Sequence, residues 1–514
     1  MEALHIVSTI LVIIITKLAY NFINAVWFRP KKLEKNLKDQ GFQGNPYRSF
    51  HGDLPEINRL RRLALSKPFS SLTHDIMSRI LPLDHQTVQK YGVNSYVWYG
   101  RRPRINITKP DELREIFTKH EVYNKERPQS AGSFGLVMRE GEDWAKIRRI
   151  LNPAFHVEKL KGMLPIMELS CMTMLKEWEQ MVAKEGSSCE IDVWSSLSFM
   201  SADVIARSAF GTSYKEGKRL FKLQDEHVSL SYQMLRSVTN YIPGWSYIPT
   251  KQRRRKAIVD REIDAIIRSL IEKRKESLKT RNYEYKDDLL GIMLESNEKE
   301  IEEHGRGMTI DDVMQECKLF HLAGEDTTAA LLTWTMLLLS QHQDWQTKAR
   351  DEVLDRFGND QTPDFEGINH LKIVTMIINE TLRFYPPVSS MSRMIKENTK
   401  LKKLSLLHGT EFSLPTIIVH RDPELWGNDA NEFNPGRFSE GVSNAAKAPG
   451  SFFPFGGGPR VCIGQNFALT EAKLALTKIL QRFSFQLSPS YVHAPRALVS
   501  LEPQFGTPLI LHKI

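Results

Sequence analysis

The stretch that decides the fold is Phe455-Gly-Gly-Gly-Pro-Arg-Val-Cys462-Ile-Gly464. Its run of glycines makes a loop with few Cβ atoms, and such a loop lets the backbone approach a flat ligand closely. A helix is predicted after it, because apolar residues recur at helical spacing: Ala468, Ala472, Ala475, Leu476, Ile479 and Phe483. A thiolate placed before a helix is stabilised by the helix dipole and by free N–H groups. The stretch therefore predicts a cysteine that acts as a metal ligand.

Two other interpretations of this loop are open. A buried structural cysteine beside a glycine turn would need only a short pattern such as CxG, whereas the whole spacing FxxGxRxCxG is far more specific. A phosphate-binding loop would need Gly-Lys-Ser/Thr after the glycines, and no such triplet follows. Haem iron accepts a cysteine thiolate as its axial ligand, and the thiolate favours cleavage of the O–O bond. We therefore expect Cys462 to ligate the iron of haem.

A second motif lies inside a long predicted helix. Thr309-Ile-Asp-Asp312 is a capping box, and the helical pattern runs on to about Gln341. Near its middle stands Ala323-Gly-Glu-Asp-Thr327, where glycine, acid and hydroxyl are unfavourable in a helix and invite a kink or a widened turn. The alternative is the polar face of a surface helix. It fits poorly, because apolar residues surround the helix beyond this point: Leu331, Leu332, Trp334, Leu337, Leu338 and Leu339.

Together these motifs resemble those of the cytochrome P-450 family of haem-thiolate monooxygenases. The resemblance implies a mainly α fold with small β-sheets (an α+β fold) and one haem, an iron protoporphyrin IX. It implies that Asp326 and Thr327 are catalytic, with Asp326 relaying protons and Thr327 holding oxygen and water. Phe455 and Gly464 would belong to the haem-binding loop. Position 325 departs from the pattern, because it is Glu where close relatives usually carry a neutral residue.

Haem carries two propionates, which need cations. Trp144 and Arg148 stand four residues apart and resemble the family motif WxxxR. Arg393 follows a Pro-Pro pair, and Arg460 lies in the cysteine loop. Arginine forks match carboxylates with two parallel hydrogen bonds. The alternative for each is an ordinary surface arginine, but the motif positions favour haem contact for Arg148, Arg393 and Arg460.

A further pair has a structural role in the resembling family. Glu380 and Arg383 stand three residues apart, so they share one helix face. The resemblance joins them to Arg437 of the segment Pro435-Gly-Arg-Phe438. Family members often carry Glu where this chain has Gly436, so we expect a looser loop there.

The N-terminal residues predict a membrane anchor. Residues 3–28 are largely apolar and span about 39 Å as a helix, enough to cross a bilayer. Basic residues follow at 29, 31, 32, 35 and 38, which predicts a cytosolic domain, and no signal cleavage site precedes them. The alternative is a helix that lies on the membrane. Lys17 favours this alternative, because a lysine inside the bilayer is costly. The predicted division is residues 1–28 as anchor, 29–47 as a basic linker and 48–514 as the haem-binding monooxygenase domain. The resemblance places it in the endoplasmic reticulum as a single-pass protein.

The composition fits a globular enzyme. The chain has 514 residues, 41% of them hydrophobic, and a net charge of +9. A positive surplus favours anionic lipid or an acidic protein partner, and no motif points to nucleic acid. The 4 cysteines include no close pair, which excludes a disulfide framework and a zinc ribbon.

Further stretches resemble the plant family-72 branch, which contains secologanin synthase and triterpenoid oxidases. They include Asn152-Pro-Ala-Phe155, Ile242-Pro-Gly-Trp245, Glu316-Cys-Lys-Leu-Phe320 and Ser490-Tyr-Val-His-Ala-Pro495. This resemblance implies oxidation of a terpenoid (a triterpenoid, a gibberellin-type diterpenoid or an iridoid) with O2 and NADPH-derived electrons from an NADPH–cytochrome reductase. By analogy, the substrate pocket includes residues 130–134 and 499–501, and its named candidates are Val388, Ser389, Ser390, Met391, Phe134 and Ala323.

Three other functions compete with this one. A haem isomerase that needs no reductase would usually lack the helix threonine and carry an altered cysteine loop. A haem sensor or carrier would not need Asp326 and Thr327. An inactive paralogue that only binds haem is suggested by Glu325 and Gly436. Lys473 and Arg482, near the cysteine loop, are candidates either to contact an acidic reductase or to be solvated.

Overall fold

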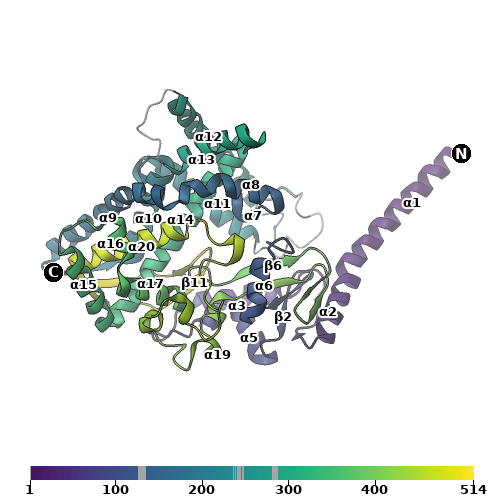
Figure 1. Ribbon diagram of the computed structural model, residues 1–514. Coiled ribbons are helices and arrows are strands. Elements are labelled where there is room, and N and C mark those ends of the chain that lie inside the picture. The colour runs from purple at the N-terminus through teal and green to yellow at the C-terminus, as the bar shows by residue number, and fades with distance from the viewer. Residues whose placement is uncertain are drawn as a thin grey trace.

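The computed structural model describes residues 2–125, 135–235, 237, 239, 245, 248–279 and 288–514. Within them helices predominate, and the strands form sheets of six, three, two and two strands. The predicted mainly α fold with small β-sheets is confirmed. In Figure 1 the helices gather at one end of the molecule, and the largest sheet lies at the other end beside α2 (Arg29–Asp39).

The longer helices form most of the body. Their bounds are α3 Leu54–Ser66, α5 Pro82–Tyr91, α6 Pro110–Thr118, α8 Gly141–Leu151, α9 Val157–Glu185, α10 Val193–Phe210, α11 Tyr214–Leu235, α12 Lys251–Lys279, α13 Leu289–His304, α14 Ile310–Gln341, α15 Gln343–Phe357, α17 Lys372–Phe384 and α20 Gln465–Arg482. Short helical turns connect them: α4 Met77–Ile80, α7 Gly135–Met138, η2 Asn152–Phe155, α16 Phe365–Asn369, α18 Thr416–Val419, α19 Pro423–Trp426, η6 Pro435–Phe438, η7 Val442–Asn444 and η8 Gly458–Arg460.

The six-stranded sheet has the order β1-β2-β3-β9-β6-β4. Its strands are β1 Gln43–Gly44, β2 Ser95–Tyr99, β3 Arg102–Asn106, β4 Tyr123–Asn124, β6 Met391–Ile395 and β9 Glu411–Leu414. The smaller sheets hold β5 Ser188–Asp192 with β10 Phe483–Leu487 and β13 Pro508–Lys513, β7 Thr399–Leu401 with β8 Leu404–Leu406, and β11 Pro495–Ala497 with β12 Leu501–Pro503. The largest sheet thus joins residues near position 100 to residues near position 400, and β6 brings Arg393 with it.

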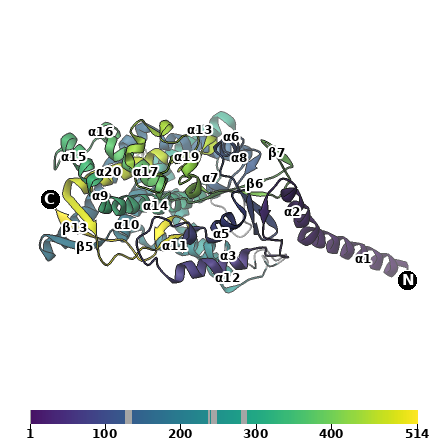
Figure 2. The same ribbon diagram turned by 90° about the horizontal axis from the view of Figure 1, so that it is seen from below.

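The N-terminal helix α1 (Glu2–Ile23) stands apart from the body of the protein. It extends as an isolated rod in both views (Figures 1 and 2). The continuous helical run His5–Asp39 is long and apolar enough to cross a membrane, with a mean hydropathy of 2.0 in a stretch of which nothing is buried. The large apolar side chains described in α1 are exposed along most of its length, and a bilayer would surround them with an apolar solvent, so α1 fits the predicted membrane anchor.

Residues 29–47, predicted as a linker, are partly folded onto the domain. They contain α2, whose Leu33 and Leu37 are buried against the main sheet. The two leucines stand one helical turn apart, so the basic residues face away from this contact. The Tyr47 hydroxyl donates a hydrogen bond to the backbone oxygen of Val26, 2.7 Å away. The division into anchor, linker and domain remains a prediction, and α2 belongs structurally to the domain.

The long helix α14 (Ile310–Gln341) has the predicted bounds and the predicted capping box. The Thr309 hydroxyl accepts a hydrogen bond from the Asp312 N–H at 3.1 Å, and the Asp312 carboxylate accepts one from the Thr309 N–H at 2.8 Å. No widened turn interrupts the α-helix from 310 to 341. Gly324 instead permits close packing with α10, because a Cβ there would lie 2.9 Å from Ile205 Cδ1. The central glycine therefore reflects a tight helix crossing.

Candidate active site

The cysteine loop is a tight turn that leads into α20. The Cys462 N–H donates to the Phe455 oxygen at 2.9 Å, which closes the loop, and Gly464 is the N-cap of α20. Gly456 and Gly458 have φ of 77° and 64°, in the left-handed region that favours glycine. A Cβ on Gly458 would also collide with the backbone oxygen of Phe117 in α6. The glycines thus serve both the turn and the close approach of two backbones.

The Cys462 side chain is accessible, although protein surrounds its loop. Burial raises the pKa of the thiol, against the Gly464 N–H and the charges of Arg148 and Lys125, which lower it. The predicted help from the helix terminus is therefore outweighed by burial. A thiol in this position becomes a stable thiolate when a metal cation binds it. The three other cysteines, Cys171, Cys189 and Cys317, are buried.

Two side chains of α8 contact the cysteine loop. The Arg148 guanidinium donates to the Val461 oxygen at 2.9 Å, so Arg148 fixes the loop beside the thiol. Trp144, one turn earlier, is buried, and the Arg460 guanidinium carbon lies 4.8 Å from the centre of its ring. Of the two motif residues, Arg148 therefore binds the loop backbone and Trp144 packs against the Arg460 guanidinium.

A patch of buried cations lies near the loop. Arg393 in β6 donates to the Ser392 oxygen at 2.8 Å, while its Nε has no hydrogen-bond partner in the part of the chain that the structure describes. Burial and the nearby charge of Arg460 lower the pKa of Arg393 to about 10. Burial, Arg393 and Arg460 lower the pKa of Lys125 to about 7. The carboxylate of Glu140 pairs with Arg460 and accepts the Lys125 backbone N–H at 2.8 Å.

This patch fits the two propionates of haem. Three basic side chains, Lys125, Arg393 and Arg460, face the single carboxylate of Glu140, so basic groups outnumber acidic ones among these four residues. Crowded cations lower one another's pKa, and a dianionic ligand relieves that repulsion. An unpartnered buried guanidinium nitrogen also needs an acceptor. Lys125 and Glu140 were not found from the sequence, since single charged residues outside any motif give no signal.

The centre of α14 faces an open space on one side. Ala323 is exposed in mid-helix, whereas residues 328–340 are buried. Thr327 is half-buried, and its hydroxyl donates to the Ala323 oxygen at 2.7 Å. Helix α14 packs against α20, which follows Cys462. Thr327 and Ala323 therefore lie on an accessible face of a core helix.

Asp326 precedes Thr327 in α14 and faces a cavity. It lines a cavity of about 590 Å³ between α11, α14 and the β11–β12 hairpin. Burial, with the charges of Glu502 and Asp225, raises the pKa of Asp326 to about 6. A carboxyl with such a pKa can hold or release a proton near neutral pH.

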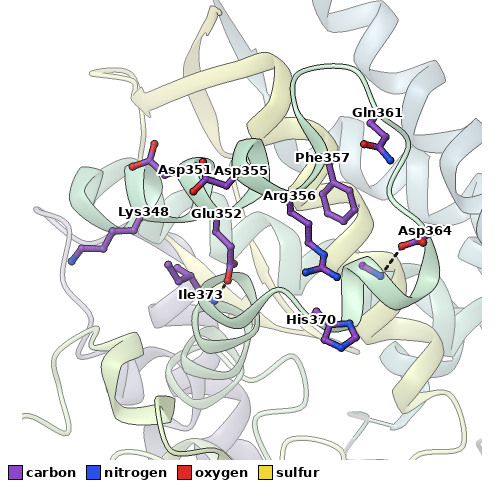
Figure 3. A pocket seen from close by; sticks show the side chains of 11 residues that line it. Lys348, Asp351, Glu352, Asp355, Arg356, Phe357, Gln361, Asp364, His370 and Ile373 are labelled. Carbon is purple, nitrogen blue, oxygen red and sulfur yellow. Dashed lines mark hydrogen bonds between the residues drawn. The ribbon is translucent and has the colours of Figure 1, made fainter.

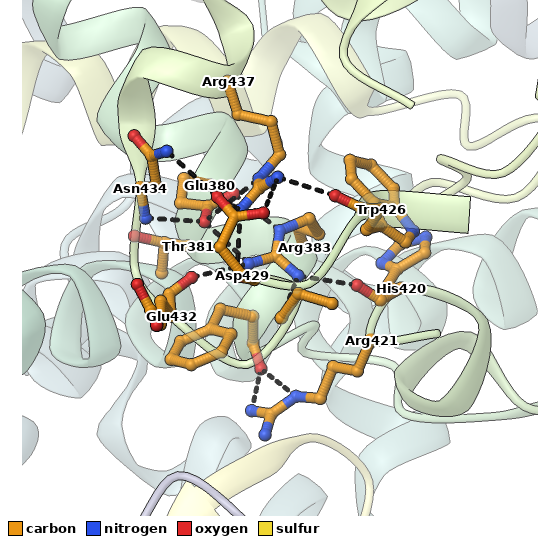
Figure 4. Close-up of polar contacts among 12 residues, drawn as sticks. Glu380, Thr381, Arg383, His420, Arg421, Trp426, Asp429, Glu432, Asn434 and Arg437 are labelled. Atoms are coloured by element: carbon orange, nitrogen blue, oxygen red, sulfur yellow. Dashed lines mark hydrogen bonds and ion pairs between the residues drawn. The ribbon is translucent and has the colours of Figure 1, made fainter. Parts of the chain in front are cut away.

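The predicted pair Glu380 and Arg383 forms a buried network (Figure 4). Two parallel bonds of 2.6 and 2.7 Å join them, and Arg383 also donates to the backbone oxygens of His420, Ala430 and Glu432. Arg437 lies 3.8 Å from Glu380 and 2.7 Å from Asp429. Asp429 thus holds the arginine, and the loop around Gly436 is fixed rather than loose.

The predicted substrate residues lie together after α17. Val388, Ser390 and Met391 are half-buried, Ser389 is buried, and the Ser390 hydroxyl lies 3.1 Å from that of Ser413. The Leu501 N–H donates to the Pro387 oxygen at 2.8 Å, which brings residues 499–501 beside this segment. Phe134 and residues 130–133 lie outside the described residues.

A cavity of about 940 Å³ lies away from the cysteine loop, between α15, α16 and α17 (Figure 3). Charged side chains line it, and one of them is already engaged. Glu352 accepts the backbone N–H groups of Lys372, Ile373 and Val374 at 2.6, 2.8 and 3.0 Å, so it caps α17. None of its lining residues belongs to the cysteine loop or to α14, so this cavity is not the active site.

Lys473 and Arg482 are poorly placed to meet a partner. Lys473 is buried. Arg482 pairs with Glu179 at 2.9 Å and is partly buried. From the sequence, contact with an acidic reductase and exposure to solvent were equal alternatives for both residues, but the burial of Lys473 and the ion pair of Arg482 fit neither well.

Comparison with known proteins identifies the family of the chain. The sequence profile of the cytochrome P450 family matches residues 75–503. The chain is 50% identical to cytochrome P450 72A397 of Kalopanax septemlobus over 96% of this chain and 95% of that one. It is 48% identical to 7-deoxyloganic acid hydroxylase of Catharanthus roseus over 96% of each.

The fold comparison points the same way. Retinoic acid bound cyanobacterial CYP120A1 superposes with a TM-score of 0.72 at 24% identity, over 84% of this chain and 94% of that one. The chain therefore belongs to the plant 72A branch of the cytochrome P450 monooxygenases, and its cofactor is haem.

Proposed function

We propose that this P450 hydroxylates or further oxidises a plant terpenoid, using O2 and electrons that an NADPH–cytochrome reductase supplies. The observation that carries the monooxygenase chemistry is the accessible Cys462 beside a patch in which three basic side chains face one carboxylate. The similarity to 7-deoxyloganic acid hydroxylase supports an iridoid among the candidate substrates, with a triterpenoid and a gibberellin-type diterpenoid as the others.

Each residue then has a defined task. Cys462 ligates the iron, while Arg393, Arg460 and Lys125 hold the propionates. Arg148 and Trp144 position the loop and Arg460. Bound haem supplies the oxygen activation and the redox chemistry. The protein supplies the ligand, the orientation and the proton path.

Proton delivery falls to α14. With a pKa raised to about 6, Asp326 exchanges protons at neutral pH. Thr327 holds a hydroxyl on the accessible face of the helix, and rotation of its side chain frees that hydroxyl from the Ala323 oxygen. We propose that Asp326 takes up protons from the cavity and that Thr327 passes them to the oxygen site.

We further propose an endoplasmic reticulum location with the domain in the cytosol. The apolar, isolated α1 and the basic residues that follow it support this orientation. A single span would hold the domain at the membrane surface, where an apolar substrate concentrates.

The ligand assignment is tested with Cys462→Ala and a matched control, Cys189→Ala in β5. We expect Cys462→Ala to lose the carbon monoxide absorbance typical of thiolate-ligated ferrous haem, and Cys189→Ala to keep it. A normal spectrum in Cys462→Ala would refute the assignment. NADPH-dependent product from terpenoid panels, with and without reductase, then separates the monooxygenase from a reductase-independent isomerase and from an inactive paralogue.

The proton path is tested with Thr327→Ala. Because the hydroxyl disappears while the helix remains, we expect NADPH consumption to continue and product per NADPH to fall at least about tenfold, since general acid catalysis contributes about 10²–10⁴-fold. Thr335→Ala is the control, since Thr335 makes the same bond to its own helix, 2.8 Å to the Leu331 oxygen, in a buried place. Equal coupling in Thr327→Ala and wild type would remove Thr327 from the path.

A further inference from the structure

The cavity between α11, α14 and the β11–β12 hairpin is more polar than a pocket for a bare hydrocarbon needs to be. The proton path uses only Asp326 of its lining. The described residues that line it are Asp225, Val228, Ser229, Tyr232, Gln233, His321, Leu322, Glu325, Asp326, Arg496, Leu498, Val499 and Glu502. Its volume of about 590 Å³ lies within the range of small-molecule sites.

Acceptors dominate this lining. Four of its side chains are carboxylic acids: Asp225, Glu325, Asp326 and Glu502. The one arginine, Arg496, is engaged by Glu502 through a 2.7 Å bond. Little positive charge is therefore left to receive an anion, whereas the hydroxyl groups of a ligand would find several acceptors.

The cluster of His321, Glu325 and Asp225 gives the cavity a fixed wall. His321 Nε2 lies 3.2 Å from a Glu325 oxygen and 3.7 Å from an Asp225 oxygen. The His321 side chain is only 3% exposed, it stacks on Phe221 at 4.9 Å, and its Nδ1 has no hydrogen-bond partner among the described residues. A buried ring held in this way orients Glu325 toward the cavity.

The acids of this wall repel one another. Burial, with the charges of Asp225 and Asp326, raises the pKa of Glu325 to about 9. The raised pKa means that a negative charge is unfavourable at this place, so Glu325 is protonated at neutral pH. A ligand carboxylate would meet the same penalty from burial and from the neighbouring acids. A neutral hydroxyl adds no charge and can donate a hydrogen bond to any of these acids.

We propose that this cavity is a substrate subsite that binds an uncharged, hydroxyl-bearing part of an oxygenated terpenoid and disfavours a carboxylate. Glu325 and Asp225 are its specificity-determining residues. This inference rests on the proposed function and narrows its substrate class. It also gives a role to Glu325, the residue that departs from the pattern of close relatives.

The test uses ligand pairs that differ in one group. Each of the three terpenoid skeletons is prepared with CH2OH and with COOH at the same carbon. Binding to the haem-loaded enzyme is followed by the spin-state change of the haem absorbance, at about pH 7.5, where the acid is ionised. The variants are Glu325→Gln and Asp225→Asn, which keep side-chain size. The matched control is Glu226→Gln, which removes a charge from α11 at a residue paired with Arg255 outside the cavity.

For at least one skeleton we expect the alcohol to bind at least about tenfold more tightly than the acid, which corresponds to about 1.4 kcal/mol. Glu325→Gln and Asp225→Asn should reduce this ratio, and Glu226→Gln should leave it unchanged. Equal or tighter binding of the acid, or a ratio that both cavity variants preserve, would overturn the subsite. If the preference for the alcohol over the acid disappears when EDTA is added, the cluster of His321, Glu325 and Asp225 holds a bound cation. That result would also overturn the subsite.

Failure of the proposed function has a different signature. In that case no member of any pair changes the spin state, although the carbon monoxide spectrum shows a normal thiolate-ligated haem. That result would remove the terpenoid substrate and the subsite together, whereas the outcomes above remove the subsite alone.

Discussion

Residues of the cysteine loop have two different roles, since one supplies a ligand and another supplies space for the backbone. Cys462 supplies the ligand, and its thiol needs a bound cation because burial raises its pKa. Gly458 supplies space and backbone freedom, because its φ is 64° and a side chain there would strike the Phe117 oxygen. The ligand role of Cys462 thus depends on a loop that has room for no side chain at position 458.

Gly458→Ala separates these two demands on the loop. The left-handed φ alone costs about 1–2 kcal/mol for an alanine. The contact with Phe117 adds to this cost, so we expect a lower unfolding midpoint and reduced haem content. Gly441→Ala is the control, because Gly441 also has a positive φ, 86°, but nothing lies within 4 Å of a Cβ there. If the two variants lost the same unfolding midpoint and haem content, the close approach of Gly458 to Phe117 would contribute nothing to stability.

At the scale of elements, the buried network of Glu380 and Arg383 ties α17 to the loop that precedes the cysteine. Glu380→Gln leaves the Arg383 charge buried without its carboxylate, and we expect a loss of about 3–5 kcal/mol in the free energy of unfolding. Asp344→Asn breaks an exposed pair with Lys348 on α15 and should cost about 0.5 kcal/mol or less. Urea midpoints measure both, and similar values would contradict the network's role.

A second buried acid connects three helices. Glu471 of α20 accepts a bond from the Ser201 hydroxyl of α10 at 2.8 Å, and Ser201 lies 3.2 Å from the Gly324 oxygen of α14. Burial raises the pKa of Glu471 from 4.5 to about 8. The folded protein therefore binds this proton more tightly than the unfolded chain. Its contribution to stability is complete below pH 4.5 and is lost as the pH rises through about 8.

Glu471→Gln should remove this pH dependence, because the amide does not titrate. Between pH 4.5 and 8, we expect the stability of wild type to fall relative to the variant by up to about 1.4 kcal/mol per pH unit. Urea unfolding at several pH values measures the difference. Parallel curves for the two proteins would mean that Glu471 is not protonated in the fold.

The elements that the sequence predicted well carry a local signal. The bounds of α14 follow from a capping box and a long apolar pattern, and both are properties of neighbouring residues. The cation patch was predicted only in part. Arg393 and Arg460 were expected from their motif positions, whereas Lys125 and Glu140 come from segments that only the folded protein brings beside them. The role of Gly324 was also hidden, since it depends on Ile205 of α10. Features that depend on neighbouring residues could thus be predicted from the sequence, whereas contacts between residues far apart in the chain could not.

At the scale of the whole molecule, the anchor and the domain meet at residues 22–47. Helix α1 is exposed along its length, whereas α2 buries Leu33 and Leu37 against the main sheet. The predicted anchor, α1, and the first helix that packs on the domain, α2, are therefore adjacent segments with separate roles. The covalent boundary between them lies before Phe22, whose ring is 5.9 Å from that of Phe50.

Two changes test this boundary. Deletion of residues 2–21 removes a largely apolar helix whose described side chains are exposed, so we expect the chain to leave the membrane fraction while its haem spectrum and urea midpoint stay unchanged. Leu37→Ala in the same truncated chain opens a cavity in the core and should cost about 2–5 kcal/mol. Leu63→Ala, at an exposed leucine of α3, is the control for the substitution itself. If the truncated chain lost stability, or if Leu37→Ala left its midpoint unchanged, α2 would belong with the anchor rather than with the domain.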